Sequence, residues 1–146
     1  MPATGSRNDP YASFNFLVEI DGVTVAGFSE CGGLTTETDP IEYRNGDEDI
    51  TVRKLPGLKK YTNINLKRGY TDSRELWEWR KKVMDGKTER QSGSIVLLNE
   101  AREPALRWNF REAWPSKWAG PTLNAKNNET AIEELEFVVE NLELED

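Results

Sequence analysis

Residues 15–23 read NFLVEIDGV, and this stretch decides the fold. From Phe14 to Ile20 every second side chain is apolar, which is the period of a strand with one buried face. Asp21-Gly22 follows, a pair favoured in two-residue hairpin turns because both central residues need a positive φ. Val23–Phe28 is predicted to return as the second strand. The chain therefore opens with an antiparallel hairpin.

Further strands are predicted from the same alternation and from turn residues. Leu34–Tyr43 is rich in β-branched residues and precedes a second turn signal, Asn45-Gly46. Trp114-Pro115 and Gly120-Pro121 bracket a predicted loop. Before Asn141 the alternating apolar residues stand at odd positions, and beyond it they stand at even positions, Leu142 and Leu144. This shift indicates a bulge or the end of one burial environment. The remaining strands are expected around Ile50–Leu55, Asn63–Lys67, Ser94–Asn99, Leu106–Phe110 and Leu135–Val139.

One helix is predicted after the central strands. Asp72 is a candidate N-cap, and Glu75 lies three residues further on, the spacing of a capping box. Gly86 is placed to end the helix in the left-handed conformation. The buried face is predicted to hold Leu76, Trp79 and Val83.

Seven or eight strands with one short helix, mostly joined as hairpins, predict an all-β fold with one accessory α-helix. The strands are expected to form an antiparallel β-sandwich or barrel, with the helix on one end or edge. A chain of 146 residues fits one domain, which should bury roughly 68–70% of the surface that the unfolded form exposes. We expect a flexible leader over residues 1–10 and a single domain over residues 11–146.

The composition argues against most familiar enzyme chemistry. The chain has no histidine, the usual general base and a common zinc ligand, and Cys31 is its single cysteine. The longest aliphatic run is Ile95–Leu98, and the first ten residues have no apolar core, so neither a membrane span nor a signal peptide is expected. We therefore expect a soluble protein made in the cytosol.

The net charge of -7 argues against a general affinity for nucleic acid or anionic membranes. The charge is uneven along the chain, at -5 over residues 1–40, +4 over residues 41–90 and -6 over residues 91–146. The ordinary interpretation is a solvated surface. The alternative is that the basic middle and the acidic ends let copies of the chain attract one another head to tail.

No segment has the spacing of a catalytic, metal or cofactor site. The acidic run at residues 47–49 lacks the regular ligand spacing and the distant bidentate carboxylate of a calcium loop. Cys31 has no basic neighbour in sequence to activate its thiol and is predicted to be a small buried hydrophobe. Arg107, Trp108 and Arg111 resemble a base-stacking platform, but alternation places Trp108 on the opposite face from the arginines. We expect no enzyme activity, no cofactor and no metal.

One loop is hard to explain on a free monomer. Pro56-Gly57 suits the central positions of a type II turn, and Leu55 and Leu58 flank it at the predicted tip. Exposed apolar residues on a long hairpin usually mark a protein interface, although the loop could also fold back on its own domain. The candidate contact residues are Ile50, Val52, Arg53, Lys54, Leu55, Pro56, Gly57, Leu58, Lys59, Lys60 and Tyr61.

The order of these features resembles a known family. NFLVEIDGV is followed by GFSECGGL, by YRNGDEDITVRKLPGLKKYTNINLKRGYT, by DSRELWEWRKKV and by WNFREAWPSKWAGPTLNA. RKLPGL combined with KRGYTDSRELW is the most specific part of the pattern. In these segments the chain resembles the inner tube protein of contractile phage tails and of related bacterial contractile injection systems.

The resemblance implies a structural role. Six copies would close into a ring whose inner strands form one continuous β-barrel, and rings would stack into a hollow tube inside a contractile sheath. The tube would deliver phage DNA or protein effectors across a target envelope, with the sheath protein, the baseplate and tube-initiating proteins as partners. The resemblance also implies synthesis in the bacterial cytoplasm, and no stable binding of nucleic acid or membrane by the subunit itself.

On this interpretation, the extended hairpin loop around residues 44–62 reaches the neighbouring ring, and Leu55 and Leu58 anchor the stacking. The polar faces of the barrel strands would line the channel. The competing interpretation is a monomeric small-ligand-binding β-barrel or a carboxylate-dependent hydrolase, which requires a pocket with convergent polar groups.

Overall fold

The computed structural model describes residues 10–12, 15–21, 23–25, 27–44, 46, 52–126 and 130–146. The elements in these residues are β1 (Phe16–Ile20), β2 (Val23–Val25), β3 (Phe28–Gly32), β4 (Thr36–Tyr43), β5 (Arg53–Tyr61), β6 (Ile64–Gly69), α1 (Glu75–Met84), β7 (Gln91–Leu98), β8 (Pro104–Ala119), β9 (Ile132–Val138) and β10 (Asn141–Leu144). The predicted leader, apart from Pro10, and the acidic run at residues 47–49 lie outside the described residues.

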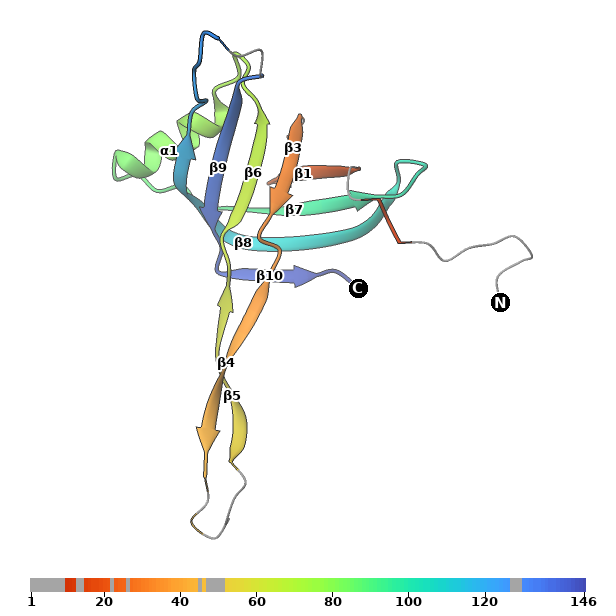
Figure 1. Ribbon diagram of the computed structural model, residues 1–146, viewed down its shortest axis with the longest axis vertical. Helices are drawn as coiled ribbons and strands as arrows, with labels where there is room; N and C mark the ends of the chain where they lie inside the picture. The colour runs from red at the N-terminus through yellow and green to blue at the C-terminus, as the bar shows by residue number, and fades with distance from the viewer. Residues whose placement is uncertain are drawn as a thin grey trace, which may run out of the picture.

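The strands form one large sheet and one two-stranded ribbon (Figure 1). The large sheet has the order β2-β1-β7-β8-β9-β6-β3, with β10 also paired with β8, and each of these pairings is antiparallel. β4 and β5 pair with each other and form a hairpin that projects away from the rest of the molecule (Figure 1). The prediction of an antiparallel all-β fold with one accessory helix is confirmed.

β8 joins two halves of the large sheet. Its first part pairs with β7 and β10, and its last part, from Trp114 onward, pairs with β9. The chain bends between the two parts at Glu112, whose φ is 56°, and the register shifts again between Pro115 and Lys117. The strands of one half therefore run across those of the other (Figure 1).

The loop predicted between Trp114 and Pro121 is wrong, because β8 continues to Ala119. The irregularity beside Pro115 lets the strand accommodate a residue that has no N–H to donate to the ladder. The carbonyl of Pro115 still accepts a hydrogen bond, from Arg80 Nη1 at 3.2 Å.

The core lies where the two halves of the sheet meet the helix. The ring of Phe137 connects them, since its centre lies 5.1 Å from that of Phe110 and 5.9 Å from that of Trp79. The other buried side chains of this cluster are Val18, Ile64, Leu66, Leu76, Ile95, Ala113, Leu135, Val139 and Leu142. Both halves and the helix therefore share one core.

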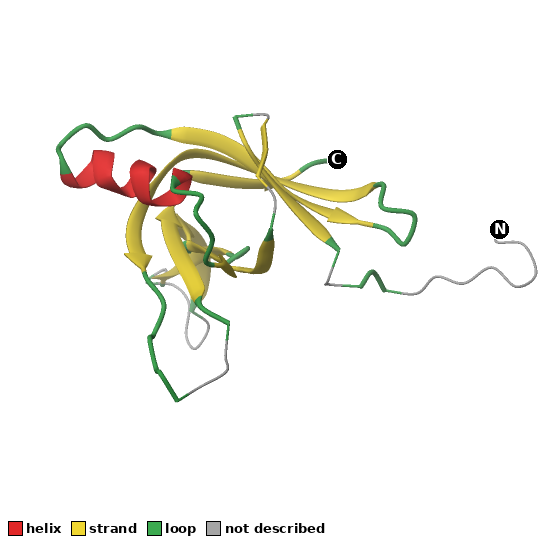
Figure 2. Ribbon diagram, turned by 90° about the horizontal axis from the view of Figure 1, so that it is seen from above, coloured by secondary structure: helices red, strands yellow, loops and turns green. Residues whose placement is uncertain are grey.

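α1 lies along one end of the sheet (Figure 2). Leu76 and Trp79 are buried as predicted, whereas Val83 is only partly buried, and Gly86 follows the helix with a φ of 79°. The predicted capping box at Asp72 is wrong, because the helix begins at Glu75 and has no side-chain cap. The Glu75 carboxylate instead accepts a hydrogen bond from the Arg68 side chain at 2.8 Å, so it does not turn back toward the helix start.

The first hairpin is confirmed, but its second strand is shorter than predicted. β1 pairs with β2 around Asp21, whose φ of 53° suits the predicted turn. The predicted continuation to Phe28 is wrong, because β3 starts there and pairs with β6 in the other half of the sheet. The phase shift predicted near Asn141 is confirmed, since β9 ends at Val138 and the chain then forms β10 beside β8.

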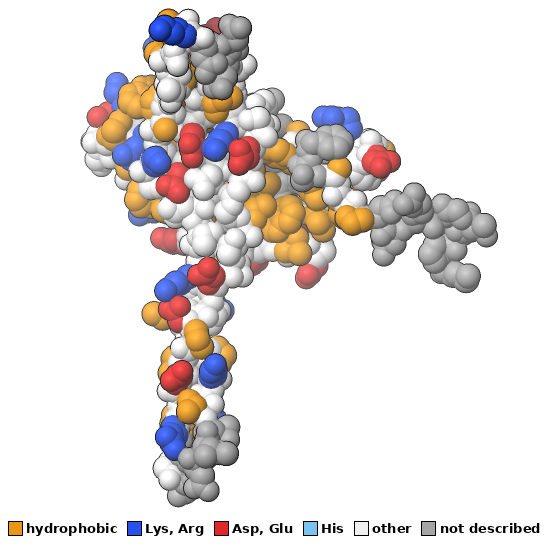
Figure 3. Space-filling view, in the orientation of Figure 1, with side chains coloured by type: hydrophobic (Ala, Val, Ile, Leu, Met, Phe, Trp, Pro, Cys, Tyr) orange, Lys and Arg blue, Asp and Glu red, His pale blue; other side chains and the backbone are white. Residues whose placement is uncertain are grey.

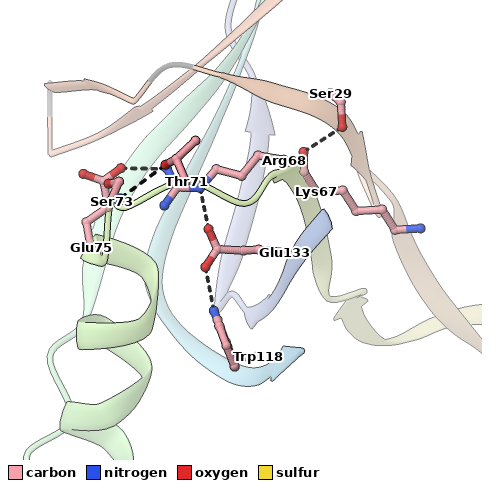
Figure 4. A network of polar contacts seen from close by, with 8 residues as sticks. All are labelled: Ser29, Lys67, Arg68, Thr71, Ser73, Glu75, Trp118 and Glu133. Atoms are coloured by element: carbon pink, nitrogen blue, oxygen red, sulfur yellow. Dashed lines mark hydrogen bonds and ion pairs between the residues drawn. The ribbon is translucent and has the colours of Figure 1, made fainter. Parts of the chain in front are cut away.

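A buried ion pair links β6 to β9, with contacts to β8 and α1 (Figure 4). Arg68 Nε donates to Glu133 Oε1 at 2.6 Å, and the two residues are only 4% and 2% exposed. Trp118 Nε1 donates to the other carboxylate oxygen at 2.9 Å. Burial lowers the pKa of Arg68, but its hydrogen bonds to Glu75 and Glu133 outweigh this and raise the pKa overall. Both oxygens of Glu133 are thus engaged within the fold, which gives this carboxylate a structural role.

Candidate inter-subunit surfaces

The β4–β5 hairpin carries most of the predicted contact residues. Ile50 lies outside the described residues, Val52 is exposed just before β5, and the other nine predicted residues form β5 itself. Tyr61 is partly buried against the core at the foot of the hairpin. Leu55 and Leu58 are 46% and 77% exposed. Tyr61 therefore anchors the hairpin to the body of the subunit, whereas Leu55 and Leu58 lie on its exposed part.

The predicted turn at Pro56-Gly57 is wrong. Both residues lie inside β5, which pairs with β4 on either side of them, and the two strands are joined between residues 43 and 53. The hairpin thus begins at Thr36 rather than at residue 44, and Ile50–Tyr61 covers only one arm of it. A two-stranded ribbon tolerates proline because each strand has an outer edge that needs no ladder donor.

Gly57 is needed for a close approach between the two arms. A Cβ atom at this position would lie 2.6 Å from the carbonyl oxygen of Asp39 and 2.9 Å from Cγ1 of Ile41. The absence of a side chain therefore lets Ile41 lie against the backbone of the opposite arm.

A bulge sets which side chains share a face of the hairpin. Ile41 pairs with Leu55 on one side of the bulge and Thr38 pairs with Lys59 on the other, so β5 has one residue more than β4 between these pairs. In a regular strand Leu55 and Leu58 would point to opposite faces, because they are three residues apart. The extra residue brings Leu58 to the face of Leu55.

The result is an apolar stripe along one face of the hairpin, which we define as Ile41, Tyr43, Leu55 and Leu58. Opposed residues of a ladder share a face, and so do residues two apart in a strand, which places Tyr43 and Ile41 beside Leu55. Ile41 and Tyr43 are 52% and 49% exposed. Figure 3 shows hydrophobic side chains along the projecting hairpin.

The prediction of the contact residues missed Ile41 and Tyr43. Their alternation with Glu42 just before the Asn45-Gly46 turn signal is the pattern that predicts them, once that turn is taken as the tip of the hairpin.

Charges of both signs accompany the stripe. Lys60 Nζ lies 3.0 Å from Asp39 Oδ2, and the hydrogen bond and charge of Asp39 raise the pKa of Lys60. Basic and acidic side chains are interspersed along the hairpin (Figure 3). The basic middle of the sequence is also divided in space, because β5 and α1 lie at opposite ends of the molecule (Figure 1). The middle segment therefore does not form a single basic end.

Strand edges are a second surface. Within the described part of the chain, β2 and β3 end the large sheet, and β10 pairs on one side with β8. These strands have three, five and four residues. An edge strand presents backbone N–H and C=O groups that can pair with another chain.

One face of the half-sheet formed by β1, β7, β8 and β10 carries linked charges. Arg107 Nη1 lies 2.8 Å from Glu19 Oε2, and Arg111 Nη2 lies 3.7 Å from Glu143 Oε1. The hydrogen bond that Arg107 donates to Glu19 raises the pKa of Arg107. Trp108 is on the other face and packs against the core, as predicted. The arginines therefore pair with carboxylates and do not build a base-stacking platform with this ring.

Among the residues that the structure describes, no three side chains of metal-ligating type gather to hold a metal ion. Cys31 is partly buried, and burial raises the pKa of its thiol to about 12. No helix in the same residues has the length and apolar character needed to cross a membrane.

The sequence matches the family model described as T4-like virus tail tube protein gp19 over residues 12–143. The chain belongs to this tail tube protein family. The resemblance found in the sequence is thereby confirmed, and the protein is a structural tube subunit. No curated protein matches the sequence.

Solved structures show the same fold in tail-like particles. A chain of the PVC sheath–tube complex, an extracellular contractile injection system in its extended state, is 28% identical, with a TM-score of 0.83 over 93% of this tail tube protein and 91% of that chain. A chain of the tube-terminating cap of the anti-feeding prophage is 27% identical, with a TM-score of 0.87 over 96% and 93%. Hcp1 from Flavobacterium johnsoniae shares the fold at 16% identity, with a TM-score of 0.57 over 90% and 94%.

Proposed function

We propose that this tail tube protein closes into hexameric rings, which stack into a hollow tube inside a contractile sheath, and that the β4–β5 hairpin contacts the neighbouring ring. The observation that carries this proposal is the apolar stripe on a hairpin that projects from the body of the subunit. Large apolar side chains that are 46–77% exposed in a lone subunit are typical of a surface that another chain covers.

Burial of the stripe supplies stacking energy. A leucine side chain that passes from water into a fully buried contact contributes about 1.5–3 kcal/mol. Leu55 and Leu58 share one face because of the bulge, so a single partner surface can cover both.

Ring closure would use the strand edges. The half-sheet β2-β1-β7-β8-β10 ends in β2 on one side and β10 on the other. Pairing the β10 edge of one copy with the β2 edge of the next would continue the half-sheet around the ring and leave neither edge exposed. Because one face of this half-sheet packs on the core, the face that carries Glu19 and Arg107 would line the channel.

The similar solved chains come from a sheath–tube complex and a tube-terminating cap, which supports a sheath protein as a partner of this protein. A baseplate with its tube-initiating proteins, and cargo in the channel, complete the partners that we propose. In this role a single domain over residues 11–146 acts by assembly, without catalytic turnover. The subunit is made in the bacterial cytoplasm, enters a phage tail or tail-like particle, and does not itself bind nucleic acid or membrane stably.

The substitution Leu58→Asp tests the stacking role. It places a charge in the stripe, far from the core, so the subunit should fold and form rings but not tubes when examined by negative-stain electron microscopy. Thr38→Asp is the matched control, because it puts the same charge on the opposite face of the hairpin, and it should leave the tubes intact. Normal tubes from Leu58→Asp would contradict the stacking role.

A further inference from the structure

A polar row crosses the half-sheet formed by β1, β7, β8 and β10. Ser94 on β7 lies opposite Glu19 on β1 and opposite Asn109 on β8. Asn109 in turn lies opposite Glu143 on β10. Opposed residues of neighbouring strands share a face, so these side chains stand on one face of the half-sheet. Ser94 Oγ donates a hydrogen bond to Asn109 Oδ1 at 2.6 Å, which links two of the strands within the row.

Arg107 lies on this face between two carboxylates. It precedes Asn109 by two residues on β8 and therefore points the same way. Its Nη1 lies 2.8 Å from Glu19 Oε2, and its Nε lies 3.4 Å from Glu145 Oε2. The backbone N–H of Glu145 also donates to the Arg107 carbonyl oxygen at 2.8 Å, which holds the end of the chain beside this arginine. The guanidinium group is thus enclosed by carboxylates from β1 and from the residue after β10.

Arg111 repeats the arrangement two residues beyond Asn109. Its Nη2 lies 3.7 Å from Glu143 Oε1, and this pair is more exposed than that of Arg107. Arg107 and Arg111 are the cationic residues on this face among the described residues of the four strands, and each has a carboxylate partner. Three carboxylates therefore stand against two guanidinium groups, which leaves one net negative charge per subunit.

Unpaired arginines on this face would hold nucleic acid. Proteins bind nucleic acid without sequence preference through cations that neutralise phosphates and release counterions. Arginine is especially effective, because its planar guanidinium group matches the geometry of a phosphate. Around a closed ring each such group recurs in every copy, so weak individual contacts would add up along one strand of nucleic acid.

We propose that Glu19, Glu143 and Glu145 mask the two arginines of the channel wall, so that nucleic acid does not adhere to it. The inference rests on the proposed function, because it concerns the face that lines the proposed channel. The masking residues occupy the guanidinium groups that phosphates would otherwise bind. They thereby determine what the wall retains, while the arginines keep the carboxylates from making the wall strongly negative.

Tubes of the variant Glu19→Gln/Glu145→Gln test the masking. Glutamine keeps the size of the side chain and can still accept a hydrogen bond from Arg107, but the face changes from one net negative to one net positive charge per subunit. Purified tubes are mixed with a short fluorescent single-stranded DNA at about 50 mM salt and sedimented. The variant should retain at least tenfold more DNA than unmodified tubes, and about 200 mM salt should release it.

Two control variants locate the effect. Arg107→Gln, added to the double variant, removes the unmasked cation and should return DNA retention to the unmodified level. Glu78→Gln/Asp85→Asn makes the same change in net charge at α1, which packs Trp79 into the core on the other side of the half-sheet. This variant should retain no more DNA than unmodified tubes.

The outcomes separate the masking from the proposed function. Intact Glu19→Gln/Glu145→Gln tubes that retain no additional DNA, or retention that persists after Arg107→Gln or rises equally in the α1 control, would overturn the masking and leave the tube role standing. Cryo-electron microscopy of the loaded tubes should place the DNA along the axis, and DNA on the outer wall would also overturn it.

A second pair on the same face keeps the test decisive. If Glu19→Gln/Glu145→Gln tubes do not form, Glu143→Gln is judged in the same way, because it frees Arg111 in a pair whose side chains are 62% and 67% exposed. Arg111→Gln is then the restoring substitution. Failure of the unmodified chain to form rings or tubes would contradict the proposed function and this inference together.

Discussion

Arg68 and Glu133 show how a single buried ion pair joins distant parts of this fold. The pair lies between β6 and β9, and its partners Glu75 and Trp118 come from α1 and β8. A buried ion pair need not add stability over an apolar pair of the same size, but removal of one partner leaves a buried charge without compensation. The residue pair therefore makes the fold sensitive to single substitutions at this place.

The substitution Arg68→Met should strongly destabilise the subunit. It leaves Glu133 charged and buried, so the free energy of unfolding should fall by about 3–5 kcal/mol. Urea denaturation of unassembled subunits, followed by tryptophan fluorescence, measures this change. Lys67→Met at the neighbouring, more exposed position should cost less than about 1 kcal/mol. Equal losses in the two variants would contradict the role of the pair.

Cys31 should react slowly in the folded subunit. Burial raises its pKa from 9.0 to about 12, and only the thiolate is alkylated. The rate with iodoacetamide should therefore keep rising by about tenfold per pH unit beyond pH 10, whereas in urea it should level off near the ordinary thiol pKa. Because the folded thiol keeps its proton to higher pH, the stability it contributes is present below pH 9 and is lost as the pH rises toward 12. A folded-state rate that levels off near pH 9 would refute this assignment.

At the scale of elements, local alternation predicted those strands that are regular and half-buried. β1 and β9 follow a period of two and were predicted with small errors at their ends. β5 and β8 were misread because each contains a proline at a place where sequence alone favours a turn. A register shift or bend beside Pro56 and Pro115 keeps both strands continuous, and such irregularities depend on the partner strand rather than on local sequence.

The candidate contact surface was predicted only in part, because its full extent also depends on how two strands pair. The segment RKLPGL predicted the correct strand of the hairpin, β5, including Leu55 and Leu58. Ile41 and Tyr43 join them only because β4 pairs with β5 in a register that the bulge sets.

The substitution Gly57→Ala should weaken assembly more than folding. The added Cβ would displace Ile41 and the Asp39 backbone, which disturbs the bulge and with it the stripe. The urea midpoint should change little, whereas the subunit concentration needed for tube formation, measured by sedimentation, should rise at least tenfold, or about 1.4 kcal/mol. Gly46→Ala is the control, because nothing lies within 4 Å of its Cβ position. Equal effects of the two alanines would argue against a special role for Gly57.

At the scale of the whole molecule, the chain is polar and has one small core, so much of its surface is available for contacts with copies of itself. The core sits at the crossing of the two half-sheets, while the hairpin and the strand edges lie around it. Stacking of rings through the hairpin of one subunit and a different surface of the next ring is heterologous, and such contacts extend without limit along a tube axis.

The mass and shape of the purified full-length protein test the central claim most directly. Native mass spectrometry combined with electron microscopy should find annular particles of six 16.7 kDa chains, about 100 kDa in all, and striated tubes as the concentration rises. A single 16.7 kDa species at every concentration, with no annular or tubular particles, would contradict the account.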